Sequence, residues 1–410
     1  MGWGDSLKSA WDSATGVAKA AAEKVAGGAA WVGDQVKGGV RAAERGIGDA
    51  VYSGIGKAKS AYDGTTGAIG NAYDKTREFF TGKPPAQPCL DCTGKDVDHD
   101  GALVGYKDGK CGPITNKGQK VTPADIEAAK QSGYNPRSNA AVDPEHPGDA
   151  TRNTSSATAK CCEQCTKGQP KRTIFYVNGI NTDKRTHCET LKQIGDTTCA
   201  TVIGVYNATE DPHLGGFSPV DAVQTSQDRN LIKSAAKGNK NLAHDGRNPA
   251  VDTLSDLVVA EQSAGRPPEI WAHSQGGAVT SLALYDANNT LKAGNKGDLS
   301  GVKVNSFGSA APQWVNGPTY NHYVNVNDAT PMLFGLGDSA SNHAAKAGGG
   351  NVVTFSGGPG SRFEDDPAKL DKHWKPAGTE YHGVDNVYIP MHAQRSSKTA
   401  EPCACDKKSQ

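Results

Sequence analysis

The chain has 410 residues, a length that corresponds to about two or three domains. Lys+Arg and Asp+Glu both number 44, so the formal net charge is zero, and no dense run of basic residues appears. These numbers exclude nucleic-acid binding driven by bulk charge. Apolar runs fall far short of the roughly 18 residues of a transmembrane helix. The first residues lack an apolar core, so no Sec-type signal peptide is expected.

Residues 1–83 contain no proline and carry a helical pattern of apolar residues. The spacing alternates threes and fours, and Val25, Val36 and Ile47 are eleven apart. This repeat predicts amphipathic helices with a period near about 3.67. The stripe is mostly Ala and Val and buries little area, so the segment needs a partner. That partner is the rest of this chain, another protein or a membrane surface.

Residues 84–170 open with Pro84-Pro85 and remain rich in Pro, Gly, Asp, Asn and Thr. They show no sustained period of helix or strand. This composition predicts a loop-rich, cysteine-containing linker or a small irregular module.

Cysteines are concentrated in this second segment. Two C-x-x-C pairs and single cysteines occur there: Cys89, Cys92, Cys111, Cys161, Cys162 and Cys165. Structural disulfides, a zinc site and free thiols remain open, although the pairs are farther apart than in small zinc modules. Farther on, Cys188 and Cys199 are predicted to form a bridge worth roughly 2–3 kcal/mol, with two buried thiols as the alternative.

An acidic run in the same segment resembles the start of a calcium loop. Asp96, Asp98 and Asp100 alternate before Gly101, as in D-x-D-x-D-G. The twelfth position of the loop is Lys107, where a bidentate Glu is needed. We therefore expect weak calcium binding or a solvated acidic turn.

Residues 171–395 alternate strand-like and helix-like stretches. Helical patterns at 251–263 and 277–287 separate β-rich apolar runs at 173–177, 201–206, 269–272, 302–307, 322–326 and 352–355. Such alternation predicts an α/β domain with a mostly parallel sheet, and ligands bind at the carboxyl ends of its strands. Residues 396–410 are assigned to a C-terminal tail.

The strongest motif follows the strand-like run at 269–272. Ala272, Ser274 and Gly276 form the pattern A-x-S-x-G, and a helix-like stretch follows. A sharp strand–turn–helix connection exposes the Ser274 hydroxyl near the positive helix N-terminus, which favours a nucleophilic serine. The neighbouring His273 is expected to have a structural role.

This motif resembles the nucleophile turn of the α/β-hydrolases, in particular the lipase class-3-like group. The stretch 323–331, YVNVNDATP, resembles the strand of that group that ends in the catalytic acid, which implies this role for Asp328. Asp328 follows a predicted strand, and the order Ser, Asp, His is the order used by the fold. The fold class we predict is therefore an α/β-hydrolase.

The general base must be a later histidine. His382 precedes a short apolar run and leaves room for the strand at 352–355. It also resembles the last histidine of the family, which is followed by an aromatic residue a few positions later. We assign the base to His382, with alternatives at His343, His373 and His392. The imidazole must reach both Ser274 and Asp328.

Two backbone N–H groups must stabilise the oxyanion. One is assigned to Gln275, the residue after the nucleophile. The other lies in the loop after the strand at 173–177 and is assigned to Gly179 or Ile180.

The stretch 175–182, FYVNGINT, together with VYN at 205–207 and AHSQG at 272–276, resembles lipase-type antibacterial effectors of type VI secretion systems. That resemblance implies a phospholipase A that needs no cofactor and acts at the periplasm or membrane of a target cell after export without a Sec signal. It also implies a loading partner for residues 1–83, an immunity protein, and no nucleic-acid partner. Two other functions stay open: a soluble esterase for small esters, or a protein that disrupts membranes through its N-terminal helices.

Overall fold

The computed structural model describes residues 99–107, 110–136, 172–180, 182–208, 219–242, 247–336, 346–364 and 381–399. The amphipathic segment 1–83, both C-x-x-C pairs and residues 400–410 lie outside these ranges. Within them, no helix is both long enough and apolar enough to cross a membrane.

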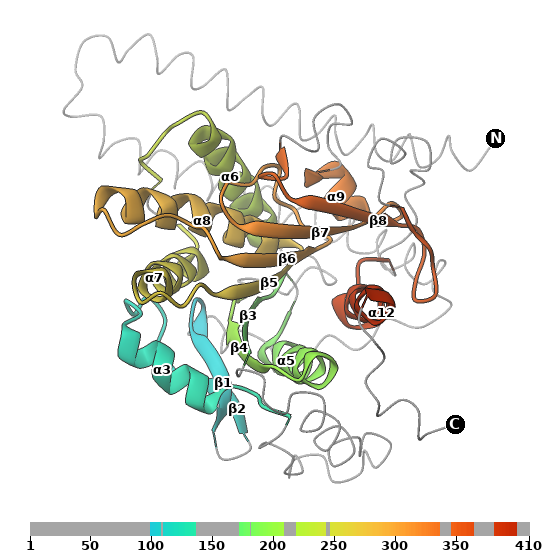
Figure 1. Ribbon diagram of the computed structural model, residues 1–410, viewed down its shortest axis with the longest axis horizontal. Coiled ribbons are helices and arrows are strands. Elements are labelled where there is room, and N and C mark those ends of the chain that lie inside the picture. The colour runs from blue at the N-terminus through green and yellow to red at the C-terminus, as the bar shows by residue number, and fades with distance from the viewer. Residues whose placement is uncertain are drawn as a thin grey trace, which may run out of the picture. The chain divides into compact units, whose positions relative to one another are not determined.

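One mixed sheet organises the described residues, with the strand order β2-β1-β4-β3-β5-β6-β7-β8-β9 (Figure 1). All neighbours from β4 to β8 pair in parallel, and the edge strands β1, β2 and β9 pair antiparallel. The strands are β1 (Leu103–Lys107), β2 (Lys110–Pro113), β3 (Thr173–Val177), β4 (Thr201–Val205), β5 (Glu269–His273), β6 (Lys303–Phe307), β7 (Thr319–Asn325), β8 (Asn351–Phe355) and β9 (Phe363–Glu364).

Helices cover both faces of this sheet (Figure 1). One face packs against α3 (Pro123–Ser132), α6 (Pro219–Ala236), α7 (Pro249–Ser263) and α8 (Gln275–Ala293). The other packs against α5 (Lys184–Thr198), the π-helical turn η7 (Val384–Tyr388) and α12 (Ile389–Thr399). A short helix, α9 (Ala329–Leu333), follows β7.

This double coverage explains the apolar runs in the sequence. All five residues of β4 are buried, as expected for a parallel strand that is covered on both faces. The structure confirms the predicted α/β architecture with a mostly parallel sheet.

The prediction of a loop-rich segment at 84–170 is wrong for residues 99–136. Here β1 extends the sheet by pairing with β4, and α3 begins with a capping box between Thr122 and Asp125. Leu103, Val104 and Ile126 are fully buried. Because β1 is covered on both faces, it shows no two-residue alternation, and its strand conformation depends on the neighbouring strand.

The chain reverses its direction of winding across the sheet at β3. The chain passes from β3 to β4 on one side and later returns to β5 on the other side. Since both neighbours are parallel to β3, the carboxyl ends of β3 and β5 lie at the same edge. Open α/β sheets bind ligands in the crevice at such a switch point. Residues 178–180 follow β3 and Ser274 follows β5, so both lie at this edge of the sheet.

Candidate active site

Ser274 occupies a tight turn between β5 and α8. Its φ of 55° and ψ of −124° are unfavourable for a residue with a side chain, at a cost of about 1–3 kcal/mol. The turn is fixed by the Ser274 N–H, which donates to the Phe307 carbonyl at 3.0 Å, and by the Ser274 carbonyl, which accepts from Ala310 N–H at 2.9 Å. A Cβ at Gly276 would lie 2.4 Å from the Val177 carbonyl oxygen. The small residue of the motif therefore lets the turn pack on β3.

The three residues that were predicted to form a triad lie in hydrogen-bond contact. His382 Nε2 is 2.8 Å from Ser274 Oγ, and His382 Nδ1 is 2.7 Å from Asp328 Oδ2. An ionised carboxylate only accepts, so Nδ1 carries the proton and Nε2 accepts from the serine hydroxyl. The imidazole can thus take a proton from Ser274 while Asp328 stabilises the resulting charge.

Asp328 is buried, and both of its carboxylate oxygens accept hydrogen bonds. It caps α9, where Oδ1 accepts from the Thr330 N–H at 2.8 Å. Oδ2 accepts from the Tyr388 hydroxyl at 2.6 Å as well as from His382. Burial, and then the adjacent Asp328 carboxylate, raise the pKa of Tyr388 well above its usual value, so the phenol remains a donor. Tyr388 lies six residues after His382 and is not among the residues predicted for the site.

His273 holds the backbone of the base. Its Nε2 lies 2.8 Å from the His382 carbonyl oxygen. Burial, and then the neighbouring His382, lower the pKa of His273 well below its usual value, so the ring is neutral and donates this hydrogen bond. The structural role of His273 is therefore to hold the main chain at His382 through this hydrogen bond.

The turn that follows His382 is tied to α5. Thr190 Oγ1 donates to Asp385 Oδ1 at 2.9 Å, and Gln193 Nε2 donates to the Asp385 carbonyl at 2.6 Å. Two elements, α5 and β5, therefore fix the position of the imidazole.

The predicted oxyanion residues flank the serine. Gln275 is the first residue of α8 and follows Ser274 directly. Gly179 lies against the serine: a Cβ at Gly179 would be 2.5 Å from Ser274 Cβ and 3.1 Å from Oγ. Only a glycine fits this approach without displacing the nucleophile.

The alternative histidines do not join this group among the described residues. His392 is packed among Trp271, Phe307 and Tyr323, with a ring-centroid distance of 4.5 Å to Trp271. His343 and His373 lie outside the described residues.

Asp100 does not reach into solvent as an acidic turn would. It is 1% exposed, and its Oδ1 accepts from the Ala208 N–H at 2.9 Å. Asp96 and Asp98 lie outside the described residues. Across the described ranges, no group of three or more His, Cys, Asp or Glu side chains could hold a metal ion.

The predicted bridge between Cys188 and Cys199 is wrong. Cys188 forms a disulfide with Cys111, 77 residues away, and Cys199 is disulfide-bonded as well. The pair joins β2 to α5, two elements that become neighbours only when β1 and β2 extend the sheet. Of the disulfide, zinc site and free thiol considered for the cysteines of this segment, Cys111 forms a disulfide.

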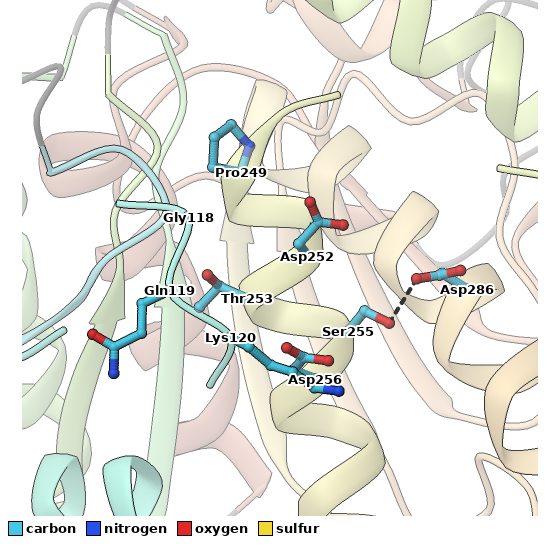
Figure 2. A pocket seen from close by; sticks show the side chains of 9 residues that line it. All are labelled: Gly118, Gln119, Lys120, Pro249, Asp252, Thr253, Ser255, Asp256 and Asp286. Atoms are coloured by element: carbon cyan, nitrogen blue, oxygen red, sulfur yellow. Dashed lines mark hydrogen bonds between the residues drawn. The ribbon is translucent and has the colours of Figure 1, made fainter. Parts of the chain in front are cut away.

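A polar cavity of about 300 Å³ lies elsewhere, along α7 and the loop 118–120 (Figure 2). Its lining includes Asp252, Asp256 and Asp286, and Ser255 Oγ donates to Asp286 at 2.9 Å. None of its lining residues belongs to the Ser274 group. It is therefore a separate feature from the candidate active site.

Comparison with protein-family models and with curated proteins identified no relative of the chain. No protein-family model matches the chain, and no curated protein matches it.

Proposed function

We propose that this chain is a serine hydrolase with an α/β-hydrolase fold that cleaves carboxylic esters of lipids. The observation that supports the proposal most directly is the hydrogen-bonded series from Asp328 through His382 to Ser274. Its nucleophile occupies a strained strand–turn–helix connection at the switch point of the sheet.

In the proposed reaction, Ser274 Oγ attacks the ester carbonyl while His382 Nε2 takes the hydroxyl proton. The N–H groups of Gln275 and of Gly179 or Ile180 bind the oxyanion of the tetrahedral intermediate. The intermediate collapses, His382 returns the proton to the leaving alkoxide, and the alcohol departs. Water then attacks the acyl-enzyme with His382 as base, which releases the acid and restores the serine hydroxyl.

We extend this proposal to phospholipids and to an antibacterial effector exported by a type VI system. The support is the resemblance of the stretches at 175–182, 205–207 and 272–276 to such effectors. The disulfide Cys111–Cys188 also favours action in an oxidising compartment such as a periplasm, since structural disulfides persist there. In this scheme residues 1–83 serve loading or membrane contact, and an immunity protein protects the producing cell.

The test is mass spectrometry of the products from vesicles of a diacyl phospholipid with different sn-1 and sn-2 chains. The full chain should release a fatty acid and a lysophospholipid, and Ser274→Ala should release neither. Vesicles of a phospholipid with two ether-linked alkyl chains serve as the control because they hold no carboxylic ester to cleave. Dye leakage from those vesicles would instead support membrane disruption. Hydrolysis of short soluble esters alone would support a small-ester esterase.

A further inference from the structure

Five side-chain amides are buried together behind the Ser274 turn. They come from the ends of β3 and β4, from α6, from the cap of α7 and from the start of α8: Asn178, Asn207, Gln224, Asn248 and Gln275. None is more than 9% exposed, and Asn178 and Asn248 are fully buried. Burying an amide is unfavourable unless the amide is hydrogen-bonded. The burial of five amides at one place therefore needs an explanation.

Asn207 is the centre of this amide network. Its Nδ2 donates to Gln275 Oε1 at 2.9 Å, and its Oδ1 accepts from Asn248 Nδ2 at 2.7 Å. Its backbone exchanges two bonds with the Asn178 side chain: the Asn207 N–H donates to Oδ1 at 3.0 Å, and the Asn207 carbonyl accepts from Nδ2 at 2.7 Å. Gln224 Oε1 closes the ring by accepting from Asn248 Nδ2 and from Gln275 Nε2, at 3.3 and 3.4 Å.

The network touches both peptide planes of the loop that faces Ser274. Asn207 Nδ2 lies 3.4 Å from the Asn178 carbonyl oxygen, and Asn178 Nδ2 donates to the Gly179 carbonyl at 2.9 Å. A trans peptide is planar, so fixing a carbonyl also fixes the direction of the next N–H. These two bonds therefore orient the N–H groups of Gly179 and Ile180, the two candidates for the second oxyanion donor.

On the other side, the network holds the residue that would supply the first donor. Gln275 follows the nucleophile, and its side chain bonds to Asn207 and Gln224. Asn207 is thus linked to the loop after β3 and to the first turn of α8, which are the two walls of the predicted oxyanion hole.

We propose that Asn207 is a positioning residue that holds the two oxyanion-hole donors at a fixed separation. The inference rests on the proposed function, because it concerns the same reaction. Oxyanion donors act by being oriented before charge develops, and loss of one donor costs about 10²–10³ in kcat. Misorientation of donors that remain present should cost less, about 10- to 100-fold.

The test uses Asn207→Ala and, as a second variant, Gln275→Met, which keeps the backbone N–H and removes the side-chain bonds. The matched control is Asn305→Ala, which removes another asparagine that is 6% exposed, from the middle of β6, where it bonds to Asn321. The readouts are kcat and KM for a soluble ester, the inhibition constant of an alkyl trifluoromethyl ketone, and urea unfolding.

For both network variants we expect kcat to fall about 10- to 100-fold with a small change in KM. The ketone, which mimics the tetrahedral intermediate, should bind more weakly by the same factor as the loss in kcat/KM. The control should lose stability without this loss of ketone affinity. If Asn207→Ala does not fold, Gln275→Met alone decides.

The inference is overturned if Ser274→Ala is inactive while both network variants keep kcat within about threefold of wild type. It is also overturned if kcat falls and ketone affinity does not. A different result, in which the wild type cleaves no ester or Ser274→Ala stays active, overturns the proposed function and this inference with it.

Discussion

Replacing Asp328 by asparagine changes one atom at the buried end of the proposed triad. Asp328 Oδ1 accepts from the Thr330 N–H, and Oδ2 accepts from His382 and Tyr388. An asparagine in the same place keeps its oxygen at the Thr330 N–H, because that group can only donate, whereas the Tyr388 hydroxyl can turn and accept from the NH₂ group. The NH₂ group then points at His382 Nδ1.

That orientation forces the wrong tautomer on the base. Nδ1 must accept, the ring proton moves to Nε2, and Nε2 can no longer take the proton of Ser274. The flipped amide would keep the productive tautomer, but the orphaned Thr330 N–H disfavours it by about 1–3 kcal/mol. A neutral amide also fails to stabilise the imidazolium. We therefore expect kcat to fall by about 10³- to 10⁴-fold, equivalent to about 4–5.5 kcal/mol at the transition state.

The assay pairs ester hydrolysis with the ¹⁵N NMR signals of His382, which report the tautomer. Tyr388→Phe is the control, since it removes one donor to Asp328 and leaves the productive tautomer in place. Its kcat should fall less than about tenfold. An Asp328→Asn enzyme that keeps more than about a tenth of wild-type kcat refutes the role of Asp328. An inactive variant that retains the Nδ1–H tautomer refutes the tautomer argument.

Three further predictions concern stability and steric fit. Asp228 is 1% exposed, burial raises its pKa from 3.8 to about 7, and among the described residues neither carboxylate oxygen has a hydrogen-bond partner. A raised carboxyl pKa stabilises the fold below pH 3.8, and this contribution is lost as the pH rises through about 7. Asp228→Asn should therefore be more stable than wild type by about 4 kcal/mol at pH 8, with a much smaller difference at pH 5, in urea unfolding; an equal difference at both pH values contradicts this. Replacing Cys111 and Cys188 together by serine should lower the free energy of unfolding by about 4 kcal/mol, because their bridge closes a 77-residue separation. Gly179→Ala should lower kcat/KM by about 100-fold and stability by about 1–3 kcal/mol, since its Cβ would meet Ser274 Cβ at 2.5 Å in a buried turn.

Much of the sheet could be predicted because each parallel strand appears in the sequence as its own short run of apolar residues. Six apolar runs separated by helical patterns gave the parallel strands, whose observed bounds differ by a few residues at most. The candidate triad was also predictable in part, since the Ser274 turn has a short, chemically constrained pattern. Asp328 and His382 depended on resemblance and chain order, and the structure brings both to Ser274.

The first strands could not be predicted, because their conformation comes from a neighbour. β1 has an apolar start and β2 is short and polar, so neither shows a period. Their pairing with β4 also decides the disulfide, because it places Cys111 beside α5. The spacing of cysteines in a sequence does not determine which pairs form.

The amide network shows a different limit. Asn178 and Asn207 each directly follow or lie near the end of a strand, where asparagine is a common turn residue. Nothing in their local sequence distinguishes a solvated turn from a buried partner, because the distinction lies in which strands are neighbours. Once β3 lies between β4 and β5, both residues are buried together, and the Asn178 side chain bonds to the Asn207 backbone. The parallel order of the sheet therefore turns ordinary strand-end asparagines into the support of the proposed catalytic turn.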